Sequence, residues 1–276
     1  MEREEIFLRV RGRAPLVHCI TNTVTINDCA NIVLAAGGSP TMANNPQEVE
    51  EITGRCDALV LNLGQIDGER VKAMLLAGRR ANELGHPVVL DPVGAGASRL
   101  RSETAARLLG ELRFSLIRGN ASEILSLLGK SEATRGVDAA EGDLVCEENL
   151  RERARAAQAL AEKTGAVVAV SGAIDLVAGA EKTAAVRNGH PMMARITGSG
   201  CMLGCLAGAF LGACPQEPFE ASLAAVAAMG VCGEIAAEKT LQSGAGTGTF
   251  RMHLLDAAST LGTAEYNRRT RVEYIL

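Results

Sequence analysis

Residues 56–96 read CDALVLNLGQIDGERVKAMLLAGRRANELGHPVVLDPVGAG. Residues 56–64 form a short apolar run that ends in glycine, and residues 87–96 repeat this pattern. The segment between them, 67–85, begins with Asp-Gly and ends with Gly, as helices often do. Two strands joined by a helix predict a right-handed crossover and a parallel sheet.

The same alternation continues on both sides of this unit. We expect strands at 15–22, 114–120 and 166–172, a hairpin-like pair at 175–189, and helices at 2–13, 26–40, 101–112, 121–129 and 150–165. Three further helical segments fill 201–262, and the polar stretch 131–148 reads as an exposed loop. The 26–40 helix is expected to be capped by Asn27 or Asp28. No linker or repeat interrupts the chain, so the fold class is α/β with one domain over residues 1–276.

Composition excludes several classes of protein. The 276 residues are 47% hydrophobic and carry a net charge of −4, so a large core is possible and no basic patch for nucleic acid or an anionic membrane is expected. The longest apolar stretch, 201–214, is too short to span a bilayer. Eight cysteines without a CxxC pair argue against a zinc site and favour free thiols in the cytoplasm. The N-terminal residues lack the apolar segment of a signal peptide.

Polar or glycine residues stand at the ends of five predicted strands. They are Asn22, Gly64, Asp91, Asn120 and Ser171. Ligands of open parallel sheets collect at the carboxyl ends of the strands, so these positions predict one common crevice and an enzyme. Within it we place Gly64 on the substrate side and Asn120 on the nucleotide side.

The stretch RITGSGCMLG, residues 195–204, sets a glycine-rich turn before an apolar helix. Free N–H groups at such a helix start, aided by the helix dipole, suit an anion such as phosphate. The pattern is neither a Walker A loop nor a Rossmann fingerprint. A glycine turn that only allows tight helix packing explains this stretch equally well.

Two further motifs carry charged groups. In LDPVGAGAS, residues 90–98, Asp91 follows a strand and could hold Mg²⁺, or it could simply cap the turn. In IRGNASEI, residues 117–124, Arg118 suits phosphate oxygens. Asn120 and Glu123 could form a helix-capping pair or face a metal-bound phosphate.

Together these segments, with VHCITNTVTINDCANIVLAAGGSPTMANNPQEV, LVLNLGQI and VAVSGAIDLVA, closely resemble the hydroxyethylthiazole kinase family. The likeness runs over about residues 15–255. It implies a ribokinase-like three-layer αβα sandwich without a separate lid domain. It also implies ATP- and Mg²⁺-dependent phosphorylation of the hydroxyl of 4-methyl-5-(2-hydroxyethyl)thiazole, a step of thiamine salvage.

The resemblance assigns roles to individual residues. It matches Asn22, Val24, Met42 and Gly198 with substrate-binding positions, Arg118 and Ser171 with ATP-binding positions, and Asp91 and Glu123 with the residues that organise Mg²⁺. The family often has Thr where this chain has Ser171, which keeps the hydroxyl. Family members are typically homotrimers with the thiazole site between subunits.

Cys201 occupies the position where the wider ribokinase-like group has a catalytic Asp, and this family has Cys. A thiol near a helix N-terminus can be partly ionised and could accept the proton of the acceptor hydroxyl. Phosphoryl transfer depends more on positioning and charge stabilisation than on early deprotonation. We therefore expect Cys201 to be a modest helper, and the backbone amides around Gly198, Ser199 and Gly200 to do most of the catalysis.

Three other functions are compatible with the sequence. A Cys-nucleophile acyl transferase would need a histidine base near Cys201, and His18 is the candidate at a predicted strand end. A catalytically silent thiazole or nucleotide sensor would not need Asp91, Glu123 and Arg118. A ribokinase-like kinase of another small alcohol, a pyrimidine or a sugar, would keep the fold and change the acceptor.

Overall fold

The computed structural model describes residues 3–129 and 145–276, and the strands of this part form one nine-stranded sheet. The strands are β1 (Leu16–Ile20), β2 (Ser39–Thr41), β3 (Ala58–Asn62), β4 (Val88–Asp91), β5 (Leu116–Asn120), β6 (Val167–Ser171), β7 (Asp175–Ala178), β8 (Thr183–Val186) and β9 (Val272–Tyr274). Their order is β2-β1-β3-β4-β5-β6-β7-β8-β9. The pairs from β2 to β6 are parallel, and those from β6 to β9 are antiparallel. The predicted, mostly parallel sheet is confirmed.

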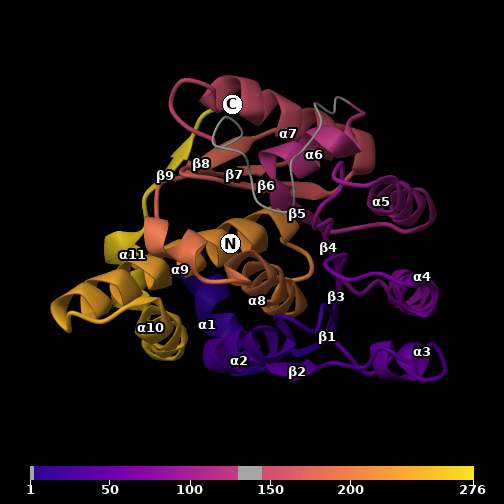
Figure 1. Cartoon of the computed structure of the whole chain (residues 1–276), viewed down its shortest axis with the longest axis horizontal. Helices are drawn as coiled ribbons and strands as arrows, with labels where there is room; N and C mark the ends of the chain where they lie inside the picture. The colour runs from indigo at the N-terminus through magenta and orange to yellow at the C-terminus, as the bar shows by residue number, and fades with distance from the viewer. Residues whose placement is uncertain (1–2, 130–144) are drawn as a thin grey trace.

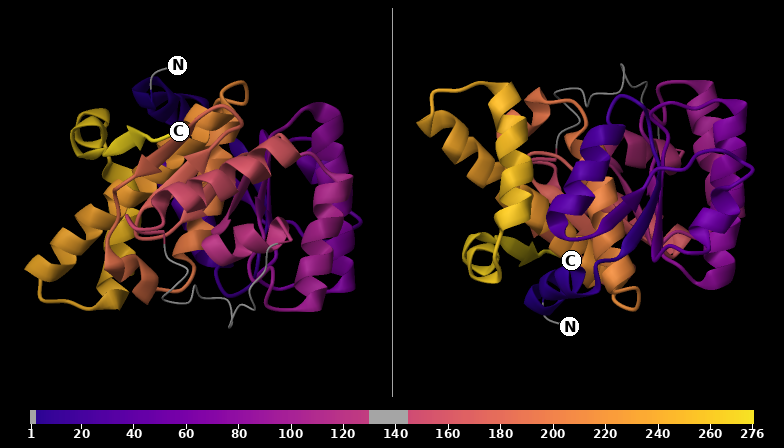
Figure 2. Two further views of the ribbon diagram at one scale, coloured as in Figure 1. Left: turned by 90° about the horizontal axis from the view of Figure 1, so that it is seen from above. Right: turned by 90° about the horizontal axis from the view of Figure 1, so that it is seen from below.

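Helices cover both faces of this sheet (Figures 1 and 2). One face carries α1 (Arg3–Arg13), α2 (Ile26–Ala36), α8 (Ser199–Ala213), α9 (Pro218–Gln242), α10 (Thr247–Thr260), α11 (Thr263–Arg269) and the 3-10 helix η2 (Pro191–Arg195). The other carries α3 (Val49–Thr53), α4 (Gly68–Leu84), α5 (Arg99–Glu111), α6 (Ala121–Leu127) and α7 (Leu150–Thr164). This is the expected three-layer αβα sandwich, and the described residues contain no separate lid.

Alternation along the strands divides the core into two apolar layers. In β3, Val60 packs into the layer under α8, whereas Leu59 and Leu61 pack into the layer under α4. Successive side chains of a strand point to opposite faces, so a strand buried on both faces is apolar throughout. The uninterrupted apolar runs of the sequence follow from this burial.

Helix α9 is the longest helix on the face that carries α8. By length and composition it could cross a membrane, and 83% of its apolar window is buried inside the protein. It packs against α8 and α10 and contacts strands β6, β7 and β8. Burial in the core accounts for its apolar composition. Residues 201–214 remain the longest uninterrupted apolar stretch, because Glu220, Ser222 and Glu234 interrupt the apolar pattern of α9.

Strand order changes direction at β1, which lies between β2 and β3 (Figure 1). The chain leaves β1 toward β2 on one side and then returns to β3 on the other. Such a reversal opens a crevice outside the carboxyl ends of the two central strands. Asn22 follows β1 and Asn62 ends β3, so both lie at this reversal.

Several boundaries differ from the predictions. Helix α2 is preceded by Thr25 and not capped by Asn27 or Asp28, because the helix begins at Ile26 and both residues lie inside its first turn. The Asn22 side-chain oxygen accepts bonds from the Thr25 N–H and hydroxyl at 3.1 Å each. Residues 131–144 of the expected loop lie outside the described residues. Residues 145–148 form a loop as expected, with Glu147 and Glu148 exposed, although Val145 is fully buried.

Candidate active site

Helix α8 begins at Ser199, with Gly198 as its N-cap in the left-handed region at φ 85°. A Cβ on Gly198 would lie 2.5 Å from Thr25 Cγ2, so both the backbone angle and the space require glycine. Met202 N–H donates to the Gly198 carbonyl at 2.8 Å. By helix geometry the amides of Ser199, Gly200 and Cys201 are left without an intrahelical acceptor. We call these three N–H groups the amide cluster.

Arg118 lies directly against the amide cluster. A Cβ on Gly200 would lie 2.5 to 2.8 Å from the Arg118 guanidinium, so glycine makes this approach possible. Arg118 Nη2 donates to Ser171 Oγ at 2.8 Å, and Nη1 lies 3.5 Å from Asp91 Oδ1. β5 and β6 therefore bring Arg118 and Ser171 to the helix start. The strand-end argument had named Ser171 but not Arg118.

Asp91 is a fully buried carboxylate at the end of β4. Its Oδ2 accepts a bond from Asn62 Nδ2 at 2.8 Å, and an ideal Cβ on Gly204 would lie 3.7 Å from the same oxygen. Burial raises the pKa of Asp91, and Arg118 and Asn62 act against this rise. The carboxylate thus faces the first turns of α8, beside the amide cluster.

Asn120 and Glu123 form the capping pair that the sequence allowed. Asn120 Oδ1 accepts from Glu123 N–H at 2.9 Å, and Glu123 Oε2 accepts from Asn120 N–H at 2.8 Å. Glu123 Oε1 also accepts from Gly94 N–H at 2.8 Å. Burial, followed by the nearby charge of Asp91, raises the pKa of Glu123 to about 7. Glu123 therefore caps α6 and still interacts electrostatically with Asp91.

These two carboxyl groups suit a magnesium ion that completes its shell elsewhere. No group of three or more His, Cys, Asp and Glu side chains among the described residues could hold a metal alone. Mg²⁺ commonly takes one or two carboxylates together with waters and phosphate oxygens. Asp91 and Glu123 are both buried and their negative charges repel each other, so a bound cation would stabilise the pair. Arg118 lies between these acids and the start of α8.

Cys201 faces two amide side chains. Asn62 Nδ2 lies 3.3 Å and Asn22 Nδ2 lies 3.5 Å from Cys201 Sγ, and Asn22 also donates to Asn62 Oδ1 at 3.0 Å. Burial, followed by the charge of Asp91, raises the pKa of the Cys201 thiol to about 11. The prediction that this thiol is partly ionised was therefore wrong for neutral pH. The effect of burial on its pKa is larger than that of the helix N-terminus.

His18 does not supply a base for this thiol. Its Nδ1 bonds with Thr53 Oγ1 and its Nε2 with the Ala43 carbonyl, each at 2.8 Å, and the ring is fully buried. Burial lowers its pKa. Both ring nitrogens are therefore occupied within the protein, which removes the residue that the acyl-transferase alternative needs.

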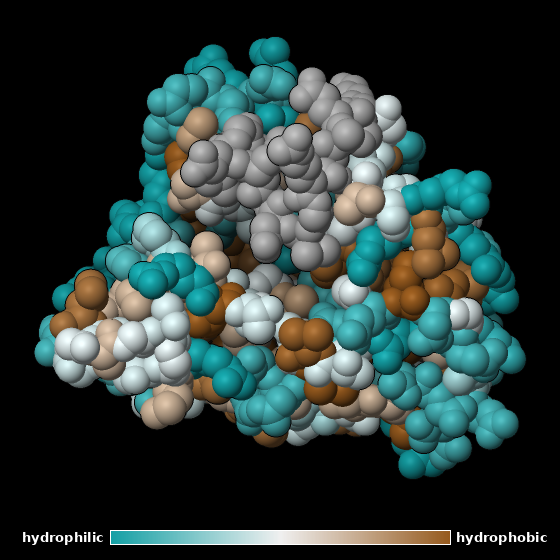
Figure 3. All heavy atoms as spheres, viewed as in Figure 1, coloured by the Kyte–Doolittle hydropathy of each residue, from teal (hydrophilic) through white to brown (hydrophobic). Residues whose placement is uncertain are grey.

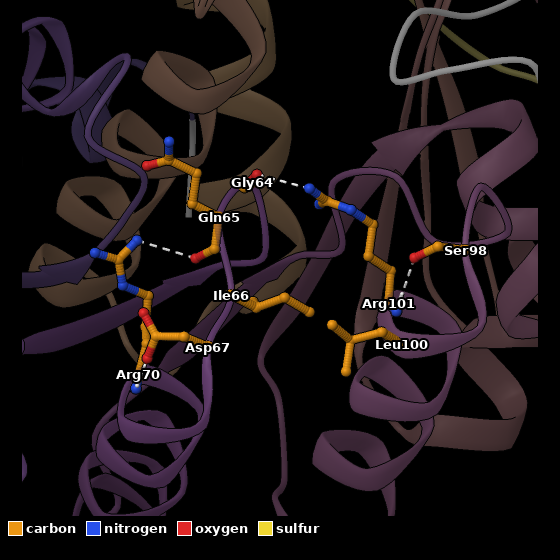
Figure 4. A pocket seen from close by; sticks show the side chains of 8 residues that line it. All are labelled: Gly64, Gln65, Ile66, Asp67, Arg70, Ser98, Leu100 and Arg101. Carbon is orange, nitrogen blue, oxygen red and sulfur yellow. Dashed lines mark hydrogen bonds between the residues drawn. The ribbon is translucent and has the colours of Figure 1, made fainter.

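The remaining predicted substrate residues lie around the β1–β3 crevice or near it. Gly64 packs against the two asparagines, since a Cβ there would lie 2.7 Å from Asn22 Nδ2 and 2.9 Å from Asn62 Oδ1. Met42 is partly buried against the α2 and α8 layer, and Val24 is 64% exposed. Gly64 also borders a pocket of about 420 Å³, whose labelled residues come from the loop before α4, the first turn of α4 and the start of α5 (Figure 4).

Sequence reasoning missed Asn62 and Thr25. Asn62 is 1% exposed and bonds Asp91, Cys201 and Asn22, and its Oδ1 also accepts from Gly64 N–H at 2.9 Å. A buried asparagine at the end of an apolar strand was the available signal. Thr25 had no comparable signal, because its role comes from the space beside Gly198.

Comparisons with known proteins extend this description. The model of the hydroxyethylthiazole kinase family matches residues 7–264. A hydroxyethylthiazole kinase of Desulfovibrio desulfuricans is 55% identical over 98% of both chains. The structure of a hydroxyethylthiazole kinase protein from Pyrococcus horikoshii matches with a TM-score of 0.88 and 35% identity over 99% of both chains.

A more distant structure agrees in fold only. A ribokinase-like superfamily protein of Enterococcus faecalis has a TM-score of 0.58 and 12% identity, covering 93% of this chain and 89% of its own. This likeness confirms the ribokinase-like arrangement of layers expected from the sequence.

Proposed function

Because this chain belongs to the hydroxyethylthiazole kinase family, we propose that it transfers the γ-phosphoryl group of ATP to the hydroxyl of 4-methyl-5-(2-hydroxyethyl)thiazole, a step of thiamine salvage. The observation that carries this proposal is the packing of Arg118 against Gly200 at the start of α8. Backbone amides and a guanidinium there converge on one anion.

On the nucleotide side, the amide cluster and Arg118 bind phosphate oxygens. Ser171 accepts a bond from Arg118 Nη2, which orients the guanidinium. Asn120 caps the start of α6 and accepts a hydrogen bond from Glu123 N–H, which keeps Glu123 in place on this side. Fixed N–H dipoles stabilise charge that spreads over the phosphoryl oxygens without having to reorganise.

In this proposal Asp91 and Glu123 would hold Mg²⁺, directly or through water. When bound, the ion neutralises charge on the phosphate oxygens. Asn62 fixes the direction of the Asp91 carboxylate through its 2.8 Å bond. The backbone N–H groups of Gly94 and Asn120 do the same for Glu123.

On the acceptor side, the thiazole occupies the crevice bordered by Asn22, Gly64 and Gly198, with Val24 and Met42 nearby. Cys201 faces the hydroxyl as a protonated thiol at neutral pH, because its pKa is about 11. Its contribution is contact and orientation, and any proton acceptance comes late in a loose transition state.

We also propose a homotrimer that works in the cytoplasm, with the thiazole site between subunits. Val24 is 64% exposed beside the crevice, and an apolar side chain there could contact both the thiazole and a neighbouring subunit. All eight cysteines are free thiols, which suits a reducing compartment. Sedimentation equilibrium gives the mass of the assembly, and a monomer that turns over at full rate would contradict the shared site.

A single assay tests the reaction. The purified protein is incubated with Mg-ATP and hydroxyethylthiazole, in parallel with a sugar and with a hydroxymethylpyrimidine, and ADP and the phosphorylated alcohol are measured. Thiazole phosphate as the main product supports the proposal. Phosphorylation of the sugar or pyrimidine instead would identify a kinase of another small alcohol, and binding of ATP and thiazole without ADP would identify a sensor.

A further inference from the structure

Arg101 holds two loops at the edge of the crevice. It lies in the first turn of α5, and its guanidinium donates to the carbonyls of Leu63, Val93 (2.6 Å) and Gly64 (2.8 Å). Leu63 and Gly64 follow β3, and Val93 follows β4. Figure 4 shows the side chain reaching from α5 toward the Gly64 loop.

The peptide groups that Arg101 holds also donate to the candidate active site. The Leu63 carbonyl shares its peptide plane with Gly64 N–H, which donates to Asn62 Oδ1 at 2.9 Å. The Val93 carbonyl shares its plane with Gly94 N–H, which donates to Glu123 Oε1 at 2.8 Å. Turning either plane would withdraw its N–H from its acceptor. One guanidinium thus sets the direction of two amides, one on the acceptor side and one on the cation side.

The guanidinium of Arg101 bonds only to the backbone. None of the ion pairs found among the described residues includes Arg101, and the hydrogen bonds of its guanidinium all go to backbone carbonyls. A planar guanidinium carries several donors in fixed directions, so it can reach two loops together. A lysine has one nitrogen and cannot reproduce this span.

We propose that Arg101 is a positioning residue for the phosphoryl transfer, acting through Asn62 on the acceptor side and through Glu123 on the cation side. This role rests on the proposed function. It predicts that loss of Arg101 weakens two processes together, acceptor binding and activation by Mg²⁺, while nucleotide binding through Arg118 and Ser171 stays unchanged.

The test compares Arg101→Ala and Arg101→Lys with the matched control Arg99→Ala. Arg99 lies on the same turn of α5, and its side chain is 91% exposed. For Arg101→Ala we expect the acceptor KM and the Mg²⁺ concentration for half-maximal rate both to rise, with kcat/KM for the acceptor about 10–100-fold lower. Arg101→Lys should recover part of this loss, and Arg99→Ala should match the wild type.

Chemical rescue separates positioning from general stability. Arg101 borders the 420 Å³ pocket with Gly64, Ile66 and Leu100, so a small cation can reach the place of a deleted guanidinium. Ile66 and Leu100 extend toward each other below the Arg101 guanidinium (Figure 4). Figure 3 shows an apolar patch on the α4–α5 side of the molecule. Millimolar ethylguanidinium should lower the acceptor KM of Arg101→Ala and leave Arg99→Ala unchanged.

A second measurement does not depend on activity. Hydrogen exchange should be faster at the amides of Gly64 and Gly94 in Arg101→Ala, and unchanged in Arg99→Ala. If the wild type does not phosphorylate the thiazole, the proposed function fails, and this exchange readout still tests the hold of Arg101 on the two peptides. A folded Arg101→Ala with wild-type exchange, acceptor KM and Mg²⁺ requirement overturns the inference. If Arg101→Ala does not fold, Arg101→Lys with all three readouts at wild-type values overturns it.

Discussion

Two glycines one turn apart on α8 meet different neighbours. A Cβ on Gly200 would press into the Arg118 guanidinium, whereas a Cβ on Gly204 would make ordinary contact with Asp91 at 3.7 Å. The Arg118 side chain can make room for this Cβ only by breaking its contacts with Ser171 and Asp91. Gly200→Ala should therefore lower kcat/KM for ATP about 10–100-fold in a folded protein, as measured by steady-state kinetics and circular dichroism.

Gly204→Ala serves as the control for this change. Alanine in place of a helix-interior glycine should stabilise α8 by about 0.5–1 kcal/mol, read from urea unfolding, and leave activity close to wild type. Equal losses of activity in both variants would show that α8 tolerates no added methyl group. The proposal that glycine is needed at position 200 to leave space for the Arg118 guanidinium would then be wrong.

Replacement of Cys201 tests how much the thiol contributes. General-base help is typically worth about 10²–10⁴-fold, and we expect Cys201→Ala to lose less than about 100-fold in kcat. A thiol with a pKa of about 11 stays protonated from pH 6 to 9, so the ratio of wild-type to variant rates should be constant over this range. A ratio that rises tenfold per pH unit would show that the thiolate is the working form.

Residues of the site could be predicted from the sequence where their position along a strand alone brings them into the site. Asp91 and Ser171 end β4 and β6, and Arg118 lies two residues before the end of β5 between them, so the order of the parallel strands brings the three together. Asn62 was missed because its importance comes from partners on three other segments, Asn22, Asp91 and Cys201. The use of Asn120 and Glu123 as a capping pair was one of two open alternatives, which the local pattern could not decide.

At the scale of elements, the helices and strands with a clear apolar pattern were predicted, and two short elements, β2 and α3, were not. β2 has three residues and includes Pro40, and α3 has five residues, so neither gives a periodic signal. Residues Val272–Tyr274 were also not expected to form a strand. β9 pairs antiparallel with β8, a long-range contact with half-exposed residues that no local pattern reveals.

Strand β9 covers the edge of the sheet. Every residue of β8 is buried, and the backbone around β9 adds bonds from Thr183 N–H to Leu276 O, from Ile275 N–H to Thr183 O and from Arg187 N–H to Arg271 O. A chain ended at Thr270 should lose roughly 2–5 kcal/mol of unfolding free energy and expose a strand edge that self-associates. Urea unfolding and sedimentation velocity measure both effects.

Glu273→Ala is the matched control for this truncation. It removes the Glu273 contact with Arg187 and keeps the β9 backbone. We expect a change within about 0.5 kcal/mol, as for most surface substitutions. A truncated chain as stable and dispersed as this control would mean that β9 adds nothing to the sheet.

For the whole molecule, the buried acids make stability depend on pH. The pKa of Glu123 is about 7 in the folded protein and near 4.3 in an unfolded chain. Between these values the folded state binds more protons, so the unfolding free energy falls as pH rises from about 4 to 7 and is then level. The cost at pH 8 relative to pH 4 should be roughly 3 kcal/mol from this group.

Urea unfolding at pH 5 and pH 8, with and without Mg²⁺, measures this dependence. Burial lowers the pKa of His18, which changes stability in the opposite direction, so the comparison uses the difference between wild type and Glu123→Gln. The wild type should lose more stability than this variant at pH 8, and Mg²⁺ should restore it in the wild type alone. Parallel curves for both proteins would contradict the assignment.

The amide of Asn62 has two hydrogens, and its nitrogen lies within bonding distance of both Asp91 and Cys201. A cation that pulls on the carboxylate and an alcohol that displaces the thiol therefore act on one rigid planar group. By thermodynamic linkage, whatever factor the cation adds to the affinity for the alcohol, the alcohol must add to the affinity for the cation. In Asn62→Ala the two equilibria should become independent, with calorimetric titrations of each ligand no longer sensitive to the other.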